Sequence, residues 1–120
     1  MSQVGCGDPE VALTCITSLA LEGNNLCRLL VQHGALAAIL ALAGPEHPVK
    51  TRISALRALG SICCVLEGIQ GFSELGGPEV VVAILADRGR GEGERREAAG
   101  VLAQVALRII VIQGLVLHNQ

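Results

Sequence analysis

The stretch "ALRALGSICCVLEG" at residues 55–68 decides the fold, because two other parts of the chain repeat its pattern. It aligns with "ALTCITSLALEG" at 12–23 and with "AAGVLAQVALR" at 98–108. Internal self-similarity with a period of about 20–50 residues is typical of stacked repeat proteins. Three apolar columns run through the alignment, each with steps of 43 residues: Ala12, Ala55 and Ala98; Ile16, Leu59 and Leu102; and Leu19, Ile62 and Val105.

Within each copy these columns follow the spacing i, i+4, i+7, which places them on one face of a helix. We therefore expect three long helices that bury this face in one aliphatic core. The composition agrees, because the chain is 51% apolar and Phe72 is its only aromatic residue. At 120 residues, the chain is expected to form a single domain.

Two shorter segments, "QHGALAAILAL" at 32–42 and "ELGGPEVVVAIL" at 74–85, form a second repeat. Each contains a glycine, Gly34 or Gly76, that permits the left-handed turn at which one helix ends and the next begins. The expected helices of the two units are 24–33, 35–43 and 49–65, then 69–76, 78–87 and from 94 onward.

Helix starts are marked by capping residues and prolines. Asp8 is predicted as an N-cap with Pro9 in the first turn, and Pro48 and Pro78 repeat the proline placement. The three valines at 80–82 also suit a strand, but the apolar run behind them favours a buried helix.

Three helices in about 42 residues, joined by a glycine turn, resemble the armadillo repeat over roughly residues 10–106. The resemblance implies an all-α fold, a right-handed α-solenoid of about two and a third armadillo-like three-helix repeats. Two-helix HEAT repeats and an unrelated helical bundle are the alternatives. We expect a flexible N-terminus at 1–7, a repeat domain at 8–106 and a divergent C-terminal tail at 107–120.

The apolar end of the chain, "ALRIIVIQGLVLHNQ" at 106–120, lacks the loop and polar first helix that would open another unit. It either prolongs the last helix or pairs as a strand. We favour a piece or shortened form of a longer armadillo protein over a tail that folds back to cover the end of the stack. Because neither end has a polar cap, the chain is expected to self-associate through its ends.

The armadillo resemblance also implies a peptide-binding groove along the third helices. Import receptors present Trp and Asn ladders there, but the corresponding positions here hold small or polar residues, with Arg57 in the Trp column. Lys50 and Arg52, near the start of the same helix, favour an acidic or polar extended segment of a protein partner. Alternatively, these cations form only the solvated side of a helix. The predicted groove residues are Thr14, Ser18, Ser54, Arg57, Ser61, Gly100 and Gln104.

Several function classes are disfavoured. A net charge of −2 and the lack of aromatic platforms argue against nucleic-acid binding, and no stretch of about 20 uninterrupted apolar residues predicts a membrane span. The five cysteines form no CxxC pair, so we expect reduced intracellular thiols. The scattered histidines His33, His47 and His118 predict no metal site and no cofactor.

Catalysis is not expected either. The glycine-rich "RGRGEGERR" at 88–96 matches no phosphate-binding fingerprint and is interpreted as a flexible loop. Of the adjacent Cys63 and Cys64, one is expected to pack inward and the other to reach the groove rim or a neighbouring helix. The competing class is an intracellular enzyme that uses Cys64 or the glycine-rich loop.

Three stretches, "CRLLVQHGALAAIL", "LRALGSICCVLEG" and "RREAAGVLAQV", are similar to the armadillo region of the inscuteable family. That resemblance implies a non-enzymatic adaptor between cortical polarity complexes and spindle-orienting proteins. It implies a cytoplasmic protein that is recruited to the cell cortex. This chain would then be the part of the adaptor that binds the polarity complex. A truncated regulatory form that occupies the partners of a longer protein is the alternative.

Overall fold

The computed structural model describes residues 8–118, and the side chains of residues 8–114. All regular secondary structure in this part of the chain is helical, and the expectation of a flexible N-terminus at 1–7 lies outside it. Its helices are α1 (Pro9–Glu22), α2 (Asn24–Gln32), α3 (Ala35–Leu42), α4 (Val49–Ile62), α5 (Leu66–Glu74), α6 (Gly77–Ala86) and α7 (Glu92–His118).

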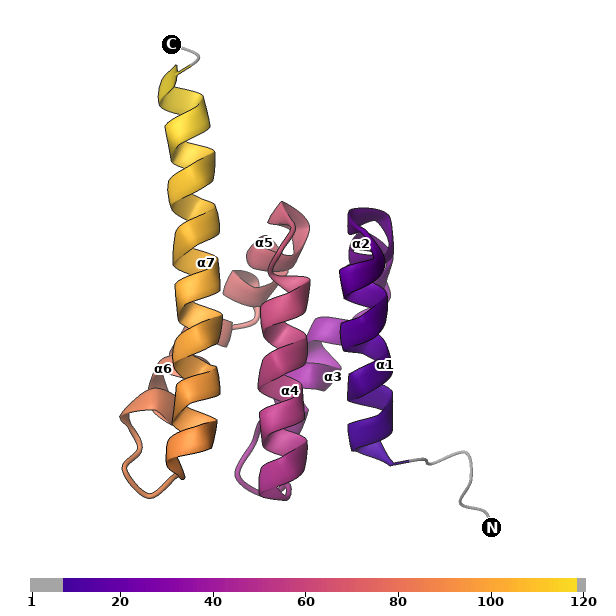
Figure 1. Cartoon of the computed structure of the whole chain (residues 1–120), viewed down its shortest axis with the longest axis vertical. Helices are drawn as coiled ribbons and strands as arrows, with labels where there is room; N and C mark the ends of the chain where they lie inside the picture. The colour runs from indigo at the N-terminus through magenta and orange to yellow at the C-terminus, as the bar shows by residue number, and fades with distance from the viewer. Residues whose placement is uncertain (1–7, 119–120) are drawn as a thin grey trace.

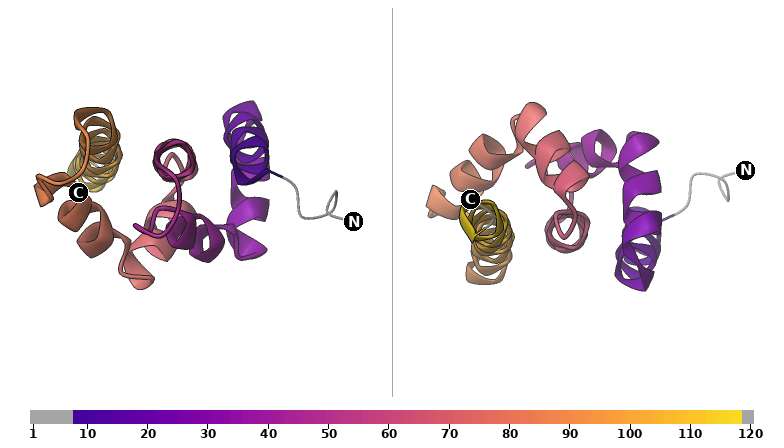
Figure 2. Two further views of the ribbon diagram at one scale, coloured as in Figure 1. Left: turned by 90° about the horizontal axis from the view of Figure 1, so that it is seen from below. Right: turned by 90° about the horizontal axis from the view of Figure 1, so that it is seen from above.

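The helices form two layers. Helices α1, α4 and α7 run side by side in one layer, and the four short helices form the other (Figures 1 and 2). Within the long-helix layer α4 packs between α1 and α7, while α2 contacts α5 in the short-helix layer. The helix order confirms the predicted units: α2, α3 and α4 form one, α5, α6 and α7 form the next, and α1 is the third helix of an incomplete unit.

The predicted apolar columns form the core where a helix has neighbours on both sides. Ala55, Leu59 and Ile62 of α4 are fully buried because α1 and α7 flank them. Ile16 of α1 and Leu102 of α7 are partly buried and pack against the same core. The long helices therefore share one continuous aliphatic interior.

The column prediction is wrong at two positions of α1. Ala12 is exposed and Leu19 is 44% exposed, whereas Leu13 and Ala20 are buried instead. The reason is positional: no helix of the described residues covers the outer side of α1, so only the face toward α2 and α4 is enclosed.

The turns follow the predicted capping chemistry with one difference. Gly34 and Gly76 adopt φ of +81° and +74°, the left-handed conformation expected of them. Asp8 caps α1, where its carboxylate accepts a 2.9 Å hydrogen bond from the Glu10 amide. Pro48, however, is the N-cap of α4 and not a residue of its first turn.

The corner between α4 and α5 comes earlier than predicted. Helix α4 ends at Ile62 instead of residue 65, and α5 begins at Leu66 instead of residue 69. Val65 between them is extended, with φ −116° and ψ 155°. The turn lets Gly68 approach so closely that a Cβ there would lie 2.1 Å from the carbonyl oxygen of Ile62.

Residues of the predicted tail continue α7 to His118 as one helix of 27 residues. The tail therefore does not fold back over the end of the stack (Figure 1). It presents exposed apolar side chains at Leu107, Ile109, Ile110 and Val111. The domain boundary at 106 stays a prediction.

Length and composition alone would let Glu92–Gly114 of α7 cross a membrane, and only 11% of its most apolar window is buried. The pair α2 and α3 passes the same test together, although it is bent by 81°. One or two such helices are weak evidence for a membrane span. The expectation that the chain has no membrane span therefore also stays a prediction.

Candidate functional site: a polar groove between α1, α4 and α7

Two adjoining hollows lie between the long helices. The first, of about 170 Å³, is lined by Thr14, Thr17, Ser18, Ser54 and Arg57 of α1 and α4. The second, of about 500 Å³, is lined by Thr17, Leu21, Arg57, Gly60, Ser61, Cys64, Gly100, Gln104 and Arg108. Because they share Thr17 and Arg57, we treat them as one surface, the long-helix groove. All seven predicted site residues line it.

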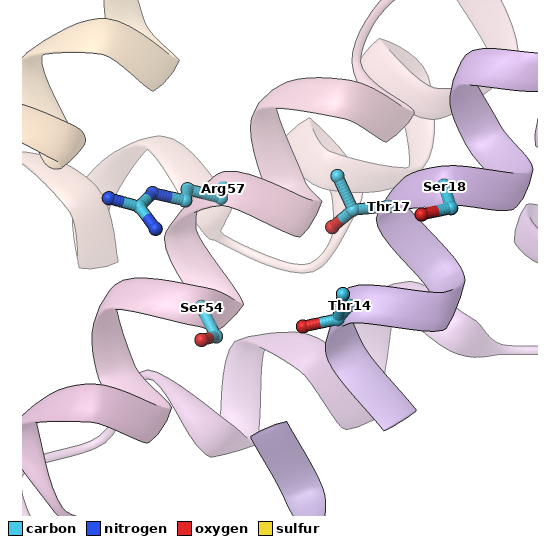
Figure 3. Close-up of a pocket in the computed structure, with 5 residues that line it drawn as sticks. All are labelled: Thr14, Thr17, Ser18, Ser54 and Arg57. Atoms are coloured by element: carbon cyan, nitrogen blue, oxygen red, sulfur yellow. The ribbon is translucent and has the colours of Figure 1, made fainter. Parts of the chain in front are cut away.

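Helical spacing explains how the groove assembles. Thr14 and Ser18 are four apart on α1, Gly100 and Gln104 are four apart on α7, and the α4 positions follow at i, i+3 and i+7. Thr14, Thr17 and Ser18 extend from α1 on the side that faces α4, while Arg57 extends away from α1 (Figure 3). These short side chains leave room between the helices.

The hydroxyl oxygens in the groove remain free to accept hydrogen bonds. Thr14, Thr17 and Ser61 each donate to the carbonyl four residues earlier, over 2.8, 2.9 and 3.1 Å. Their oxygens can still accept a hydrogen bond. Ser18 and Ser54 form no side-chain hydrogen bond within residues 8–118. The groove can therefore accept hydrogen bonds from the amides of an extended chain.

Arg57 is the charged residue that lines both hollows of the groove. Its side chain is 62% exposed, and its Nε lies 3.0 Å from Oε2 of Glu97 on α7. An anionic ligand would therefore compete with Glu97 for this guanidinium. The sequence reasoning missed Glu97 and also Arg108, a second groove cation, although Arg108 follows Gln104 by one helical turn.

The prediction that Arg52 contributes to the groove is wrong. Its Nε and Nη2 lie 2.8 and 3.0 Å from the two carboxylate oxygens of Glu94, and Nη1 donates to the carbonyl of His47. Only 14% of its side chain is exposed. Lys50 is exposed but lines neither hollow.

Glu94 forms the centre of a buried ion cluster. Its side chain is fully buried and pairs with Arg90 as well as Arg52. Burial alone would raise its pKa, but hydrogen bonds from the two arginines hold the pKa of Glu94 below its ordinary value. Arg90 also lies 3.5 Å from Asp87 and donates to the carbonyl of Ala43.

This cluster corrects the interpretation of residues 88–96 as a flexible loop. Helix α7 already begins at Glu92, so most of the segment is helical. Arg90, in the part that remains a loop, is anchored to Glu94 and to the end of α3.

The adjacent cysteines divide as predicted. Cys63 is fully buried, and burial raises the pKa of its thiol to about 12. Cys64 is partly buried and lines the groove. No group of three or more His, Cys, Asp or Glu residues within the described part of the chain is arranged to hold a metal ion.

Comparison with known proteins supports the armadillo architecture. A designed armadillo repeat protein superimposes with a TM-score of 0.71 and 26% sequence identity, over 81% of this chain and 40% of the designed chain. The all-α fold is therefore an armadillo-like solenoid.

Sequence comparison identifies the family. The inscuteable homolog of Homo sapiens is 38% identical over 88 residues, and that of Mus musculus is 37% identical over 87. These matches span 73% and 72% of this chain but only 15% of each relative. The family model described as "Protein inscuteable C-terminal" matches residues 8–115. The chain therefore belongs to the inscuteable family.

Proposed function

We propose that this chain is a non-enzymatic adaptor module that holds an extended segment of a partner protein in the long-helix groove. The observation that carries the proposal is the meeting of seven polar or small positions from three helices in two connected hollows. Both the inscuteable family and the armadillo fold are of the adaptor kind, which supports protein binding over catalysis.

The groove favours an acidic or polar segment. Free hydroxyl oxygens at Ser18 and Ser54 suit backbone amides, and Gln104 offers both a donor and an acceptor. A ligand carboxylate can replace Glu97 at Arg57 and pair with Arg108. The one aromatic residue, Phe72, is buried, so no aromatic wall exists for basic side chains.

The family suggests where this module acts. We place it in the cytoplasm, recruited to the cell cortex, on the side of the adaptor that meets polarity complexes during spindle orientation. Because the match spans only 15% of each curated relative, activities of their remaining length are not assigned to this chain. A shorter form that occupies partners of a longer protein would use the same groove.

A display selection of random peptides on the intact chain tests the groove without knowledge of the natural partner. We expect the selected peptides to be polar or acidic. Arg57→Glu should weaken their binding at least about tenfold, equivalent to about 1.4 kcal/mol, in fluorescence polarisation.

Arg96→Glu is the matched control, because Arg96 is 75% exposed on the same layer but lines neither hollow. It should leave binding unchanged. Basic peptides from the selection, or equal binding by Arg57→Glu with unchanged helicity by circular dichroism, would exclude the proposed groove.

A further inference from the structure

A pair of thiols lies where α2 meets the end of α4. Cys27 of α2 is fully buried, and its Sγ lies 3.6 Å from Sγ of Cys64. The same sulfur lies 3.6 and 3.5 Å from the carbonyl oxygens of Ser61 and Ile62. These contacts hold Cys27 against the last turn of α4, although the two cysteines are 37 residues apart in sequence.

The two sulfurs differ in access to solvent. Cys64 is partly exposed and lines both the long-helix groove and a neighbouring hollow of about 550 Å³ between α2, α5 and α7. Cys27 has no exposed surface. A soluble oxidant can therefore reach Cys64 first, with Cys27 directly behind it.

We propose that Cys27 and Cys64 form an oxidation site at which hydrogen peroxide converts the two thiols into an intramolecular disulfide. Cys64 follows the end of α4 and is not held inside a helix. Closing a 3.6 Å separation to the roughly 2.05 Å of a disulfide needs a local shift of about 1.5 Å. Cys63 is a poorer partner for Cys64, because a disulfide between adjacent residues is strained.

The step balances with peroxide as the oxidant. The Cys64 sulfur attacks one peroxide oxygen, the O–O bond breaks, and Cys64 becomes a sulfenic acid as one water leaves. The Cys27 sulfur then attacks the Cys64 sulfur, the S–O bond breaks, and the departing hydroxide takes the Cys27 proton to form a second water. Two thiols lose two electrons and two protons, and one peroxide is reduced to two waters.

Burial raises the pKa of Cys27 to about 12, with the contact to Cys64 adding to the effect. Cys27 therefore stays a thiol at neutral pH and does not attack peroxide directly. Its place directly behind Cys64 assigns it to the second step, in which it gives up its proton to the departing hydroxide. The resulting bond would tie α2 to the α4–α5 corner and remove the Cys64 thiol from the groove rim.

The test is peptide mapping of the reduced, full chain after treatment with stoichiometric hydrogen peroxide and alkylation of the remaining thiols. Cleavage after glutamate separates Cys6, Cys15 and Cys27 into different fragments, because Glu10 and Glu22 lie between them. Cys63 and Cys64 fall together in fragment 47–67, where fragment-ion sequencing distinguishes them.

We expect a fragment in which 23–46 is linked through Cys27 to Cys64, lighter by two hydrogens than the separate fragments. Cys64→Ser should abolish the link, and Cys15→Ser, at an exposed position of α1, should leave it intact. If Cys27 stays alkylatable in the unaltered chain while Cys64 passes to sulfinic acid or to a bond between molecules, the proposal is wrong.

Discussion

At the residue scale, Glu94 is the side chain whose role is least visible in the sequence. A buried carboxylate is costly unless it is paired and hydrogen-bonded. Here Arg52 and Arg90 satisfy it, and within the described residues no buried side-chain nitrogen or oxygen lacks a partner. Arg90 and Arg52 also donate to the carbonyls of Ala43 and His47 in the α3–α4 loop. Because Arg90 itself belongs to the α6–α7 loop, the cluster ties these two loops to α4 and α7.

Replacing Glu94 should therefore reveal a large stability contribution. Glu94→Gln leaves the largely buried Arg52 without a counter-charge and Arg90 with only Asp87, so we expect the free energy of unfolding to fall by about 3–5 kcal/mol. Urea denaturation followed by circular dichroism measures this. Glu92→Gln removes only the exposed pair with Arg96, so it should cost less than about 1 kcal/mol. Equal effects of the two changes would refute the cluster's role.

The lowered pKa of Glu94 also predicts how the stability of the folded chain depends on pH, and the same variant tests this dependence. Because the pKa of Glu94 is lower in the folded chain than in the unfolded chain, its contribution is complete above the ordinary glutamate pKa of about 4.3. It is lost as the pH falls through the lowered folded value. We expect this acid-dependent loss in the unaltered chain and a smaller loss in Glu94→Gln.

At the element scale, the corner between α4 and α5 depends on close backbone contact. A side chain at Gly68 would collide with the carbonyl oxygen of Ile62, which the structure cannot move without breaking the turn. The sequence prediction placed this corner too late because "VLEG" has the apolar spacing of a continuing helix. The requirement for a turn comes from packing α5 against α2.

Gly68→Ala should therefore destabilise the chain by about 1–3 kcal/mol, the usual cost of overpacking. Gly93→Ala is the control, because a Cβ at Gly93 meets nothing within 4 Å. In the first turn of α7 it should be neutral or stabilising by up to about 1 kcal/mol. Thermal unfolding of both variants measures the difference, and a tolerated Gly68→Ala would show that the corner can relax.

Helix α7 shows why the end of the chain was ambiguous. Ile109, Ile110 and Val111 have high strand propensity, and local sequence left both conformations open. A strand needs a partner edge for its backbone hydrogen bonds, and the all-helical body of residues 8–118 presents none. Continuation of the helix pairs the backbone N–H and C=O groups of this segment with one another.

At the scale of the whole molecule, the face of the stack formed by α1 and α2 resembles an interior surface, although no other helix of residues 8–118 covers it. Leu19, Leu26, Leu29, Leu30 and His33 line an apolar hollow of about 290 Å³ there. Leu19 and Leu29 are 44% and 48% exposed. The repeat equivalent of Leu19 is Ile62, which is buried, and that of Leu29 is Gly71, which lies against Leu36 of the preceding unit.

We expect this face to drive self-association, because exposed apolar surface of this kind favours contact with a second molecule. Sedimentation velocity should show species heavier than the monomer as protein concentration rises. Leu29→Glu should shift this association to at least about tenfold higher concentration, because a charge in the apolar contact costs more than about 1.4 kcal/mol. Gln70→Glu adds the same charge at an exposed position of α5 and should change nothing. A strictly monomeric unaltered chain would contradict the expectation.

Sequence by itself determined the helical repeat. It follows from helical periodicity, which is local: residues three, four and seven apart share a face whatever lies beyond, and each copy of the repeat restates the same face. The groove positions were implied by the resemblance to the armadillo repeat, and the same spacing places those on each long helix on one side. The division of Cys63 and Cys64 between core and groove was also predicted, although both residues lie beyond the end of α4 and not within the helix that the prediction assumed.

Only the tertiary structure decided what each face meets. Arg52 and Glu94 are 42 residues apart, and nothing local distinguishes this arginine from one that faces solvent. The pairing of Arg57 with Glu97, the nearness of Cys27 to Cys64 and the exposure of Ala12 and Leu19 likewise depend on which helices stack and where stacking stops. Such contacts arise between distant segments, so periodicity along one helix carries no information about them.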